Sequence, residues 1–376
     1  MKYFTLSLAL FLFVFVQPMV GQNENDETDY NFEVVKEAPH TATKNQGQAG
    51  TCWSYATVSF FESELMRLHD KEIDLSELFF VYHAYIAKAE RYVMRHGLSN
   101  FSQGGQAHDV TDVIRDYGMI TEDAYSGKTY AGDLHNHFEM EAMLKGMLDG
   151  LIEQRRKMPE WKKAFKAVLD VYLGAIPETF TFDEKQVSTT EFRNNMGINP
   201  DDYIEFTSYL HYPMYDEVIL DIPDNWSFDK YYNVPLDELM TIINNAIDNG
   251  HTVVWDGDVS EAGFNHSEGI AVVPTEDALE EEAFKHQIAE EIKITPEVRE
   301  EMFMSQQSTD DHLMHLIGTS EDSQGNMYYI IKNSWDADSN EFDGKLHMSA
   351  PYARAHTVAI MVHKDAVPKS IMKKFE

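Results

Sequence analysis

The sequence predicts an α+β fold with a helical first half and a β-rich second half. Residues 53–68 place apolar side chains such as Trp53, Phe60 and Leu65 at the spacing of a core-facing helix. Residues 312–318 (HLMHLIG) and 327–332 (MYYIIK) are short runs rich in β-forming residues, and the polar residues between them are typical of a hairpin. With 376 residues, 43% of them hydrophobic, the chain can bury a large core.

The N-terminus has the pattern of a secretory signal peptide. A lysine at position 2 precedes an apolar run over residues 6–16, and Pro18 and Gly21 follow. We expect a signal peptide over residues 1–21 with cleavage near Gly21, then an acidic linker over residues 22–36. An uncleaved anchor is the alternative, but the run is short for a membrane span. The protein is therefore expected to be secreted or periplasmic, with no stable membrane span after cleavage.

The single cysteine, Cys52, lies where a nucleophile is favoured. Gly47 and Gly50 interrupt regular structure before it, and the predicted helix follows, so Cys52 stands at a helix N-terminus. The unpaired amides and the helix dipole there are expected to lower the pKa of its thiol. A lone cysteine has no disulfide partner in its own chain. An inert buried cysteine is the structural alternative.

A thiol nucleophile also needs a base, a group that orients the base, and donors for an oxyanion. Gln46 lies six residues before Cys52, across a glycine turn that can bring its amide beside the sulfur. The predicted hairpin would bring His312 beside Asn333, whose side chain could fix the imidazole tautomer. The chain holds 16 histidines, so spacing alone selects none of them.

These residues carry a resemblance to a known family. Gln46, the GTCW around Cys52, His312 and the KNSW around Asn333 resemble the signature regions of papain-like cysteine peptidases, in the same chain order. Further segments are similar to the bleomycin hydrolase and aminopeptidase C branch. They are LSELFFVYH (75–83), GGQAHDV (104–110), GAIPETFTF (174–182), NVPLDELM (233–240) and DDHLMH (310–315). The resemblance extends from Lys44 to Pro368.

The resemblance implies a papain-like two-domain fold with a cleft between the halves. It makes Cys52 the nucleophile, His312 the acid and base, Asn333 the residue that orients His312, and Gln46 an oxyanion donor together with the Cys52 amide. It requires no cofactor and no metal.

The resemblance also implies substrate contacts and shielding. Gly104 and Gly105 resemble the family's contact with the substrate backbone, and Trp335 would shield the hydrogen bond between His312 and Asn333 from water. One departure is Asp336, which stands where the family has a glycine.

The organisation of the chain indicates a large insertion into the papain-like core. The cysteine and the histidine are 260 residues apart (312−52=260), against roughly 130 to 150 in papain-like enzymes. We expect a helical half over 37–130 with Cys52 and a helical insertion over 131–244, containing amphipathic helices at 140–152 and from Pro159 to Leu169. A β-rich half over 245–376 would hold His312, Asn333 and the C-terminal tail, beginning with a strand at 252–255.

Other charged groups are expected at the surface. The acidic tract 276–301 is predicted to form a solvated helix, and His347, His356 and His363 are expected to be solvated or capping. His312 and His315 could form a metal site, but residues three apart on a strand point to opposite faces, which disfavours it.

The charge excludes nucleic acid as a partner. The chain has 30 basic against 64 acidic residues, a net charge of −34, which would repel phosphate backbones. Peptides are the expected substrates. The resemblance also implies a homo-oligomer, since relatives form hexamers.

The expected activity is therefore that of an exported cysteine peptidase, an aminopeptidase of the bleomycin hydrolase type. In that branch the C-terminal tail lies in the cleft and captures the substrate's free amine. Here 13 residues follow His363, so an endopeptidase with an open cleft is an alternative. A non-catalytic papain-like binding protein and a transglutaminase-like acyl transferase are further alternatives.

Overall fold

The computed structural model describes residues 29–129 and 134–375. The predicted signal peptide and the first part of the predicted linker, residues 1–28, lie outside the described residues. The helices are α1 (Cys52–His69), α2 (Glu77–Met94), α3 (Ala107–Tyr117), α4 (Phe138–Ile152), α5 (Glu160–Leu173), α6 (Thr189–Asn195), α7 (Leu236–Asp248), α8 (Glu276–Glu281), α9 (Pro296–Met304), α10 (Ala350–His356) and α11 (Lys369–Met372). The strands are β1 (Glu33–Glu37), β2 (Phe180–Phe182), β3 (Lys185–Val187), β4 (Tyr203–Thr207), β5 (Asp216–Ile219), β6 (Lys230–Asn233), β7 (Val253–Gly257), β8 (Phe264–Asn265), β9 (Ile270–Ala271), β10 (His312–Glu321), β11 (Met327–Lys332), β12 (Lys345–Ser349) and β13 (Thr357–His363).

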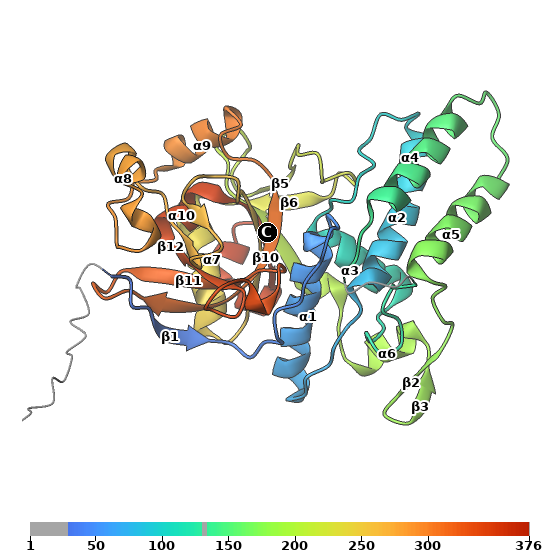
Figure 1. Ribbon diagram of the computed structural model, residues 1–376, viewed down its shortest axis with the longest axis horizontal. Helices are drawn as coiled ribbons and strands as arrows, with labels where there is room; N and C mark the ends of the chain where they lie inside the picture. Colours follow the sequence, from blue (N-terminus) through green and yellow to red (C-terminus); the bar gives the residue numbers. More distant parts are fainter. Residues whose placement is uncertain (1–28, 130–133, 376) are drawn as a thin grey trace, which may run out of the picture.

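Helix α1 lies between the helical half and the sheet (Figure 1). It contacts β10 and β7 on one side and α2 and α3 on the other. Phe60, Phe61 and Leu65 are fully buried in this position, and burial of each such side chain contributes roughly 1.5–3 kcal/mol. The helix predicted at 53–68 is confirmed. Because α1 packs along β10, its first residue is held against the strand that carries His312.

The outer part of the helical half is formed by α4 and α5, which pack on α2 and form the right-hand edge of the molecule in Figure 1. Both helices predicted for this region are confirmed. Met140, Leu144 and Leu148 are fully buried, so the apolar stripe of α4 belongs to the core. Gly146 and Gly150 face open space, as expected for its polar side.

The β-rich half is built on a twisted sheet that the described residues form from 11 strands, with the order β5-β6-β4-β13-β7-β10-β11-β12-β9-β8 and with β1 on β10. The predicted hairpin is confirmed, since β10 and β11 pair antiparallel from His315 with Lys332 to Glu321 with Met327. Strand β10 also pairs with β7 near its start, where His312 lies opposite Gly257. This central position holds His312 rigidly.

Two segments differ from the sequence-based expectation of linker and insertion. Glu33–Glu37, placed in the acidic linker, forms β1 on the edge of β10. Residues 131–244 were expected to be one helical insertion. From residue 134 the chain forms α4, α5, the antiparallel pair β2 and β3, and α6, but β4, β5 and β6 then join the main sheet next to β13. These segments become strands because β4 can pair with the open edge of β13. The local periodicity of the sequence gives no sign of this pairing.

One prediction about charged groups is wrong, and another is wrong in part. The tract 276–301 is not one solvated helix, because α8 ends at Glu281 and α9 begins only at Pro296. The histidines of the C-terminal region are not solvated: His347, His356 and His363 are all buried. His363 does cap, since its side chain accepts a hydrogen bond from the Asp365 amide.

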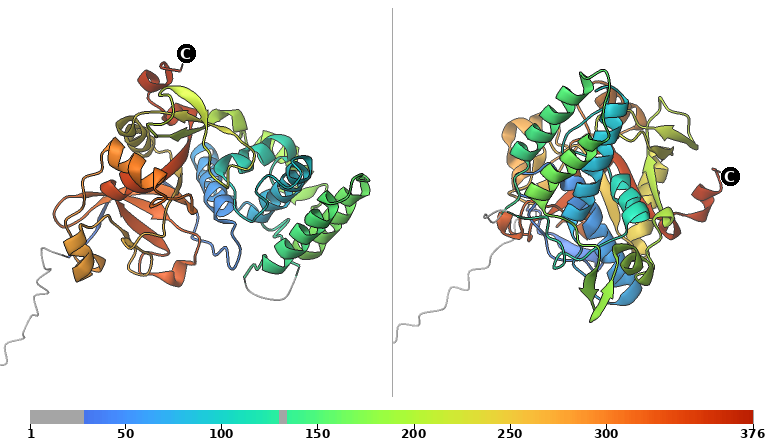
Figure 2. Two further views of the ribbon diagram at one scale, coloured as in Figure 1. Left: turned by 90° about the horizontal axis from the view of Figure 1, so that it is seen from above. Right: turned by 90° about the vertical axis from the view of Figure 1, so that its right-hand side faces the viewer.

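The C-terminal tail packs on the outside of the sheet. Ile371 in α11 is buried, the Phe375 ring lies 4.6 Å from that of Tyr232 in β6, and Lys374 pairs with Glu238 in α7 at 2.5 Å. Figure 2 shows this end at the periphery of the molecule. Among the described residues, none of the helices is both long and apolar enough to cross a bilayer.

Candidate active site

Cys52 is the first residue of α1 and is 9% exposed. Hydrogen bonds from Ser54 and Tyr55 to the Thr51 carbonyl begin the helix, so the backbone amide of Cys52 precedes the intrahelical ladder and is available to a ligand. The thiol is hydrogen bonded to the backbone of Leu313, the residue after His312 on β10. The fold thus brings together Cys52 and the start of β10, which are 260 residues apart (312−52=260).

The pKa of Cys52 shifts opposite to the sequence-based expectation. The pKa of the thiol is raised to about 12: burial is the largest cause, Asp224, Asp310 and Asp256 add to the rise, and the Leu313 hydrogen bond opposes it. The N-terminus of α1 does not offset this rise in pKa, because loss of hydration disfavours a buried thiolate more than a helix terminus stabilises it. The expectation of a lowered thiol pKa was therefore wrong for the free protein.

His312 and Asn333 lie beside each other, as predicted. Nε2 of His312 is 2.7 Å from Oδ1 of Asn333, which makes Nε2 the donor and leaves Nδ1 as the basic nitrogen. Burial lowers the pKa of His312 to about 4, and the Asn333 bond opposes that shift. The imidazole is therefore neutral in this site.

Trp335 and His266 surround this pair. The Trp335 ring lies 4.9 Å from that of His312, at the position where it can shield the hydrogen bond with Asn333. His266, which sequence reasoning missed, has Nδ1 3.2 Å from Nδ2 of Asn333 and its ring 4.9 Å from Trp335. Asn333 therefore has both ends of its amide engaged, one by each histidine. No spacing or composition signal singles out His266.

Gln46 is buried and fixed by Ser334. Its backbone amide donates to the Ser334 carbonyl at 2.9 Å, and its side-chain oxygen accepts from Ser334 Oγ at 2.6 Å. The side-chain amide nitrogen donates one hydrogen to the Ala49 carbonyl at 2.6 Å. Its second hydrogen remains for an oxyanion. The sequence analysis included Ser334 in the KNSW motif but assigned it no role.

Gly104 and Gly105 follow α2 and precede α3. A Cβ on Gly104 would overlap the carboxylate of Asp224, and one on Gly105 would lie 2.5 Å from Oδ2 of Asp109 and 3.0 Å from the Trp53 ring. Because the two glycines have no side chains, Asp224 can lie against Gly104, and Asp109 and Trp53 can lie against Gly105. Asp224 approaches from the β5–β6 loop, defined here as residues 220–229.

Three carboxyl groups that sequence reasoning did not assign lie around Cys52. They are Asp224, Asp256 on β7, and Asp310 just before β10. Burial raises the pKa of all three, that of Asp310 to about 7, and Asp256 and Asp310 interact directly. The direct interaction is a hydrogen bond between the two carboxyl groups, and Nε2 of Gln106 donates to both oxygens of Asp310 at 3.1 Å. The site beside the thiol is thus strongly acidic.

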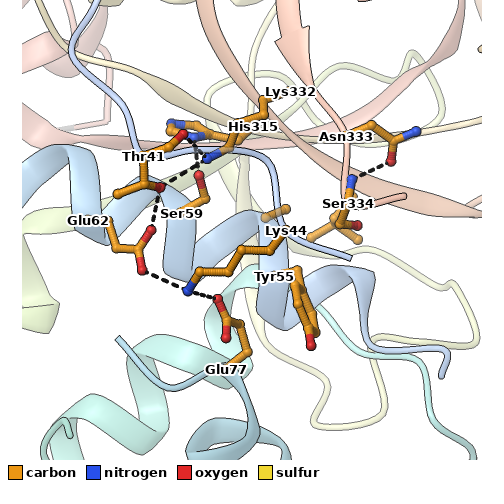
Figure 3. A pocket seen from close by; sticks show the side chains of 12 residues that line it. Thr41, Lys44, Tyr55, Ser59, Glu62, Glu77, His315, Lys332, Asn333 and Ser334 are labelled. Carbon is orange, nitrogen blue, oxygen red and sulfur yellow. Dashed lines mark hydrogen bonds and ion pairs between the residues drawn. The ribbon is translucent and has the colours of Figure 1, made fainter. Parts of the chain in front are cut away.

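A small polar cavity lies beside α1, and its lining includes Asn333 and Ser334 (Figure 3). Its volume is about 10 Å³, room for one water at most. Lys44 pairs there with Glu62 and Glu77, and Nδ1 of His315 lies 2.7 Å from Ser59 Oγ. His315 is thus engaged away from His312. Within the described chain, His, Cys, Asp and Glu form no group of three arranged to hold a metal.

Asp336, which stands where the resemblance places a glycine, has a positive φ. Its φ is 101°, in the region that disfavours a side chain. Its carboxylate accepts from Asn45 Nδ2 at 3.0 Å and from the Asp338 amide at 3.3 Å. These bonds hold the loop that follows Trp335.

The comparison with protein families decides the classification. The model of the Peptidase C1-like family matches residues 17–376. The chain belongs to this family. This match confirms the resemblance to papain-like peptidases that the sequence motifs indicated. It identifies the chain as a papain-type cysteine peptidase.

Relatives of this C1-like peptidase agree with that assignment. It is 22% identical to aminopeptidase C of Listeria monocytogenes over 88% of this chain and 82% of that protein. It is 37% identical to the viral cathepsin of Antheraea pernyi nuclear polyhedrosis virus over 76 residues, 20% of this chain and 24% of that protein. The crystal structure of PepW from Lactobacillus rhamnosis HN001 superposes with a TM-score of 0.73 at 18% identity, covering 91% of this chain and 84% of PepW. The α+β papain-like fold of this C1-like peptidase is therefore confirmed.

Proposed function

We propose that this chain is an exported cysteine aminopeptidase that hydrolyses peptide bonds with Cys52, His312 and Asn333. One observation carries the proposal: Asn333 holds Nε2 of His312 at 2.7 Å, while the Cys52 thiol lies against the next residue of the same strand, Leu313. This arrangement supplies a nucleophile, a base with a defined tautomer, and the group that orients the base.

The mechanism begins from a neutral thiol and a neutral imidazole. Nδ1 of His312 accepts the thiol proton as the Cys52 sulfur attacks the scissile carbonyl. The Cys52 amide and the free hydrogen of the Gln46 side chain stabilise the oxyanion. His312 then protonates the leaving amine, and later activates the water that releases the acyl group. No cofactor enters this sequence.

The aminopeptidase part of the proposal is supported by the Listeria relatives that bear that name, at 22% identity. An endopeptidase is the second candidate, because the C-terminal tail packs against β6 and α7 and is not the element beside Cys52. A non-catalytic binding protein would not require the ordered contacts of Gln46, His312 and Asn333. The GGQ and PETF matches favour a peptidase over an acyl transferase.

The experiment is hydrolysis of fluorogenic peptides that carry free or acetylated N-termini. Wild type should release the fluorophore from free N-termini only, and Cys52→Ala should be inactive, with Ser54→Ala as a control for a change in the same turn. Equal cleavage of acetylated peptides would favour the endopeptidase. If wild type cleaves no peptide of the series, the enzyme proposal fails.

Export and assembly are tested separately. N-terminal sequencing of the protein recovered outside the cytoplasm should begin near residue 22, whereas an uncleaved anchor would retain residue 1. Sedimentation equilibrium tests the proposed hexamer against a monomer of 43.3 kDa for the full chain.

A further inference from the structure

A second histidine, His266, lies against the proposed catalytic pair. It stands in the turn between β8 and β9, outside the hairpin that carries His312 and Asn333. The His266 ring and the His312 ring each lie 4.9 Å from that of Trp335, so both imidazoles contact one indole. Asn333 forms a hydrogen bond with each of them. The mechanism of Cys52, His312 and Asn333 leaves His266 without a role.

The orientation of the Asn333 amide follows from a donor that cannot change. The backbone N–H of Ser334 donates to Oδ1 of Asn333 at 2.7 Å, so this end of the amide is the acceptor. The opposite end is Nδ2, which can only donate. Because Nδ2 lies 3.2 Å from Nδ1 of His266, that ring nitrogen is the acceptor and carries no proton.

The other nitrogen of the His266 ring agrees with this assignment. Nε2 lies 2.7 Å from Ser339 Oγ, and the Ser339 hydroxyl donates its own hydrogen to the Asp336 carbonyl. The Ser339 oxygen therefore accepts the Nε2–H of His266. The hydrogen bonds form one row in which every donor points the same way, from His312 through Asn333, His266 and Ser339 to Asp336.

We propose that His266 is a positioning residue of the reaction, which holds the Asn333 amide, and through it His312, only as the neutral Nε2–H tautomer. The inference rests on the proposed function. A protonated His266 would point a second N–H at Nδ2 of Asn333, and two donors cannot bond to each other. Asn333 would then move away or turn, which weakens the bond that leaves Nδ1 of His312 as the base.

The surroundings of His266 favour its neutral form. His312 faces it across Asn333, and a charge on one of these rings disfavours a charge on the other. The acids on its own turn, before β10 and in the loop after Trp335 are Glu268, Asp311, Asp336, Asp338 and Glu341. Burial lowers the pKa of His266 below its usual range. The row of hydrogen bonds is therefore complete at neutral pH and is lost as the pH falls through the pKa of His266.

The test compares three substitutions in the mature protein. His266→Phe keeps a ring beside Trp335 but removes the acceptor, whereas His266→Asn supplies an amide oxygen as the acceptor and cannot take up a proton in this pH range. Ser267→Ala is the matched control, since Ser267 is exposed, follows His266 in the chain and bonds to Asn265 at 2.8 Å. Thermal melting verifies folding. Ser339→Ala, which removes the acceptor for Nε2–H, replaces the phenylalanine variant if that variant does not fold.

The kinetics use the fluorogenic peptide of the proposed series that wild type cleaves fastest. His266→Phe should lower kcat about tenfold, as for loss of one hydrogen bond to a buried group. KM should stay within about twofold, because the bond orients the base and does not bind the substrate. His266→Asn should restore most of kcat, and Ser267→Ala should match wild type. A phenylalanine variant as active as wild type, or an asparagine variant as impaired as phenylalanine, would overturn the inference.

The pH dependence separates positioning from a purely structural role. Below neutral pH, kcat/KM of wild type should fall more steeply, by one proton, than that of His266→Asn, because wild type needs both histidines unprotonated. Equal slopes in the two proteins would overturn the dependence on neutral His266.

Nitrogen NMR of the imidazole rings gives a readout that needs no activity. His312 should be the Nε2–H tautomer in wild type and in His266→Asn, and a mixture of tautomers in His266→Phe. If wild type cleaves no peptide, the proposed function fails. The tautomers then decide the inference by themselves, and an unchanged Nε2–H tautomer of His312 in His266→Phe would overturn it.

Discussion

Ser334 Oγ donates a hydrogen bond to Oε1 of Gln46 over 2.6 Å, and both side chains are buried. This bond fixes which end of the Gln46 amide faces the Ala49 carbonyl, and therefore where its second hydrogen points. The proposed oxyanion donor thus depends on a residue adjacent to Asn333. One segment of the β-rich half orients both the base and the oxyanion donor.

The first prediction concerns this donor. Gln46→Ala should lower kcat about 10²–10³-fold with little change in KM, because an oxyanion donor acts mainly in the transition state. Ser334→Ala should lower kcat less, since the amide is then misoriented but present. Steady-state kinetics measures both. A change in KM alone would show that Gln46 binds the ground state and not the oxyanion.

The second prediction concerns the orientation of His312. Asn333→Ala should lower kcat about tenfold to a hundredfold, the equivalent of ~1.4–2.8 kcal/mol, because Nε2 loses its buried acceptor. Asn333→Asp is the matched variant, since it keeps an acceptor at 2.7 Å but adds a charge. It should retain more activity than alanine. An alanine variant as active as wild type would remove Asn333 from the site.

The third prediction concerns the charge state of the thiol. Burial raises the pKa of Cys52 to about 12 and lowers that of His312 to about 4. The folded protein therefore holds the thiol and the imidazole neutral between these values. The rate of alkylation of Cys52 by iodoacetamide should rise continuously from pH 6 to pH 9. A plateau beginning below pH 6 would show a preformed thiolate and contradict this assignment.

Substitution of the aspartates around Cys52 should shift the pH dependence of its alkylation. Asp224, Asp310 and Asp256 raise the pKa of Cys52, so Asp224→Asn should lower it and increase the alkylation rate at pH 7.5. The exposed Asp221→Asn should leave the profile unchanged. A slower reaction of Asp224→Asn would give the opposite sign and contradict the electrostatic assignment.

The fourth prediction concerns backbone strain at Asp336. At φ 101° a side chain costs about 1–3 kcal/mol, whereas glycine costs roughly 0.5–1 kcal/mol in unfolded-state entropy. Asp336→Gly should therefore raise the melting temperature by a few degrees, even with the bonds to Asn45 and Asp338 lost. Asp338→Gly, at a helical backbone position, should lower it. A lower melting temperature for Asp336→Gly would show that its hydrogen bonds outweigh the strain.

The fifth prediction concerns the C-terminal tail. Because Ile371 is buried in the core, removal of residues 369–376 should lower stability without opening the cleft to acetylated peptides. Ile371→Ala should lower the free energy of unfolding by about 2–5 kcal/mol, and the exposed Lys373→Ala should have little effect. Denaturant unfolding measures this. A stable truncated protein that gains endopeptidase activity would show that the tail restricts access to the cleft.

The parts of the site that could be predicted from the sequence are those with strong local patterns. The apolar spacing after Cys52 predicted α1, and two β-rich runs predicted the hairpin that joins His312 and Asn333. Each pattern depends on neighbours within about twenty residues. Helices α4 and α5 were predictable for the same reason.

Other features depend on contacts between distant segments. Strands β4, β5 and β6 lie within the region 131–244 that was predicted to be a helical insertion, and they become strands because β13 offers an edge. The pKa of Cys52 was predicted with the wrong sign because burial depends on β10 and on aspartates from three segments. His266 and Ser334 acquire their roles only from contact with Asn333 and Gln46.

The sequence by itself determined the family, the α+β class and the order of Gln46, Cys52, His312 and Asn333, because these follow from residue identity and local periodicity. Only the tertiary structure decided what surrounds the thiol. It packs the C-terminal tail on the outside of the sheet and brings the β5–β6 loop against Gly104. Burial and charge at one point depend on every segment packed there, so they become defined only when the chain is folded.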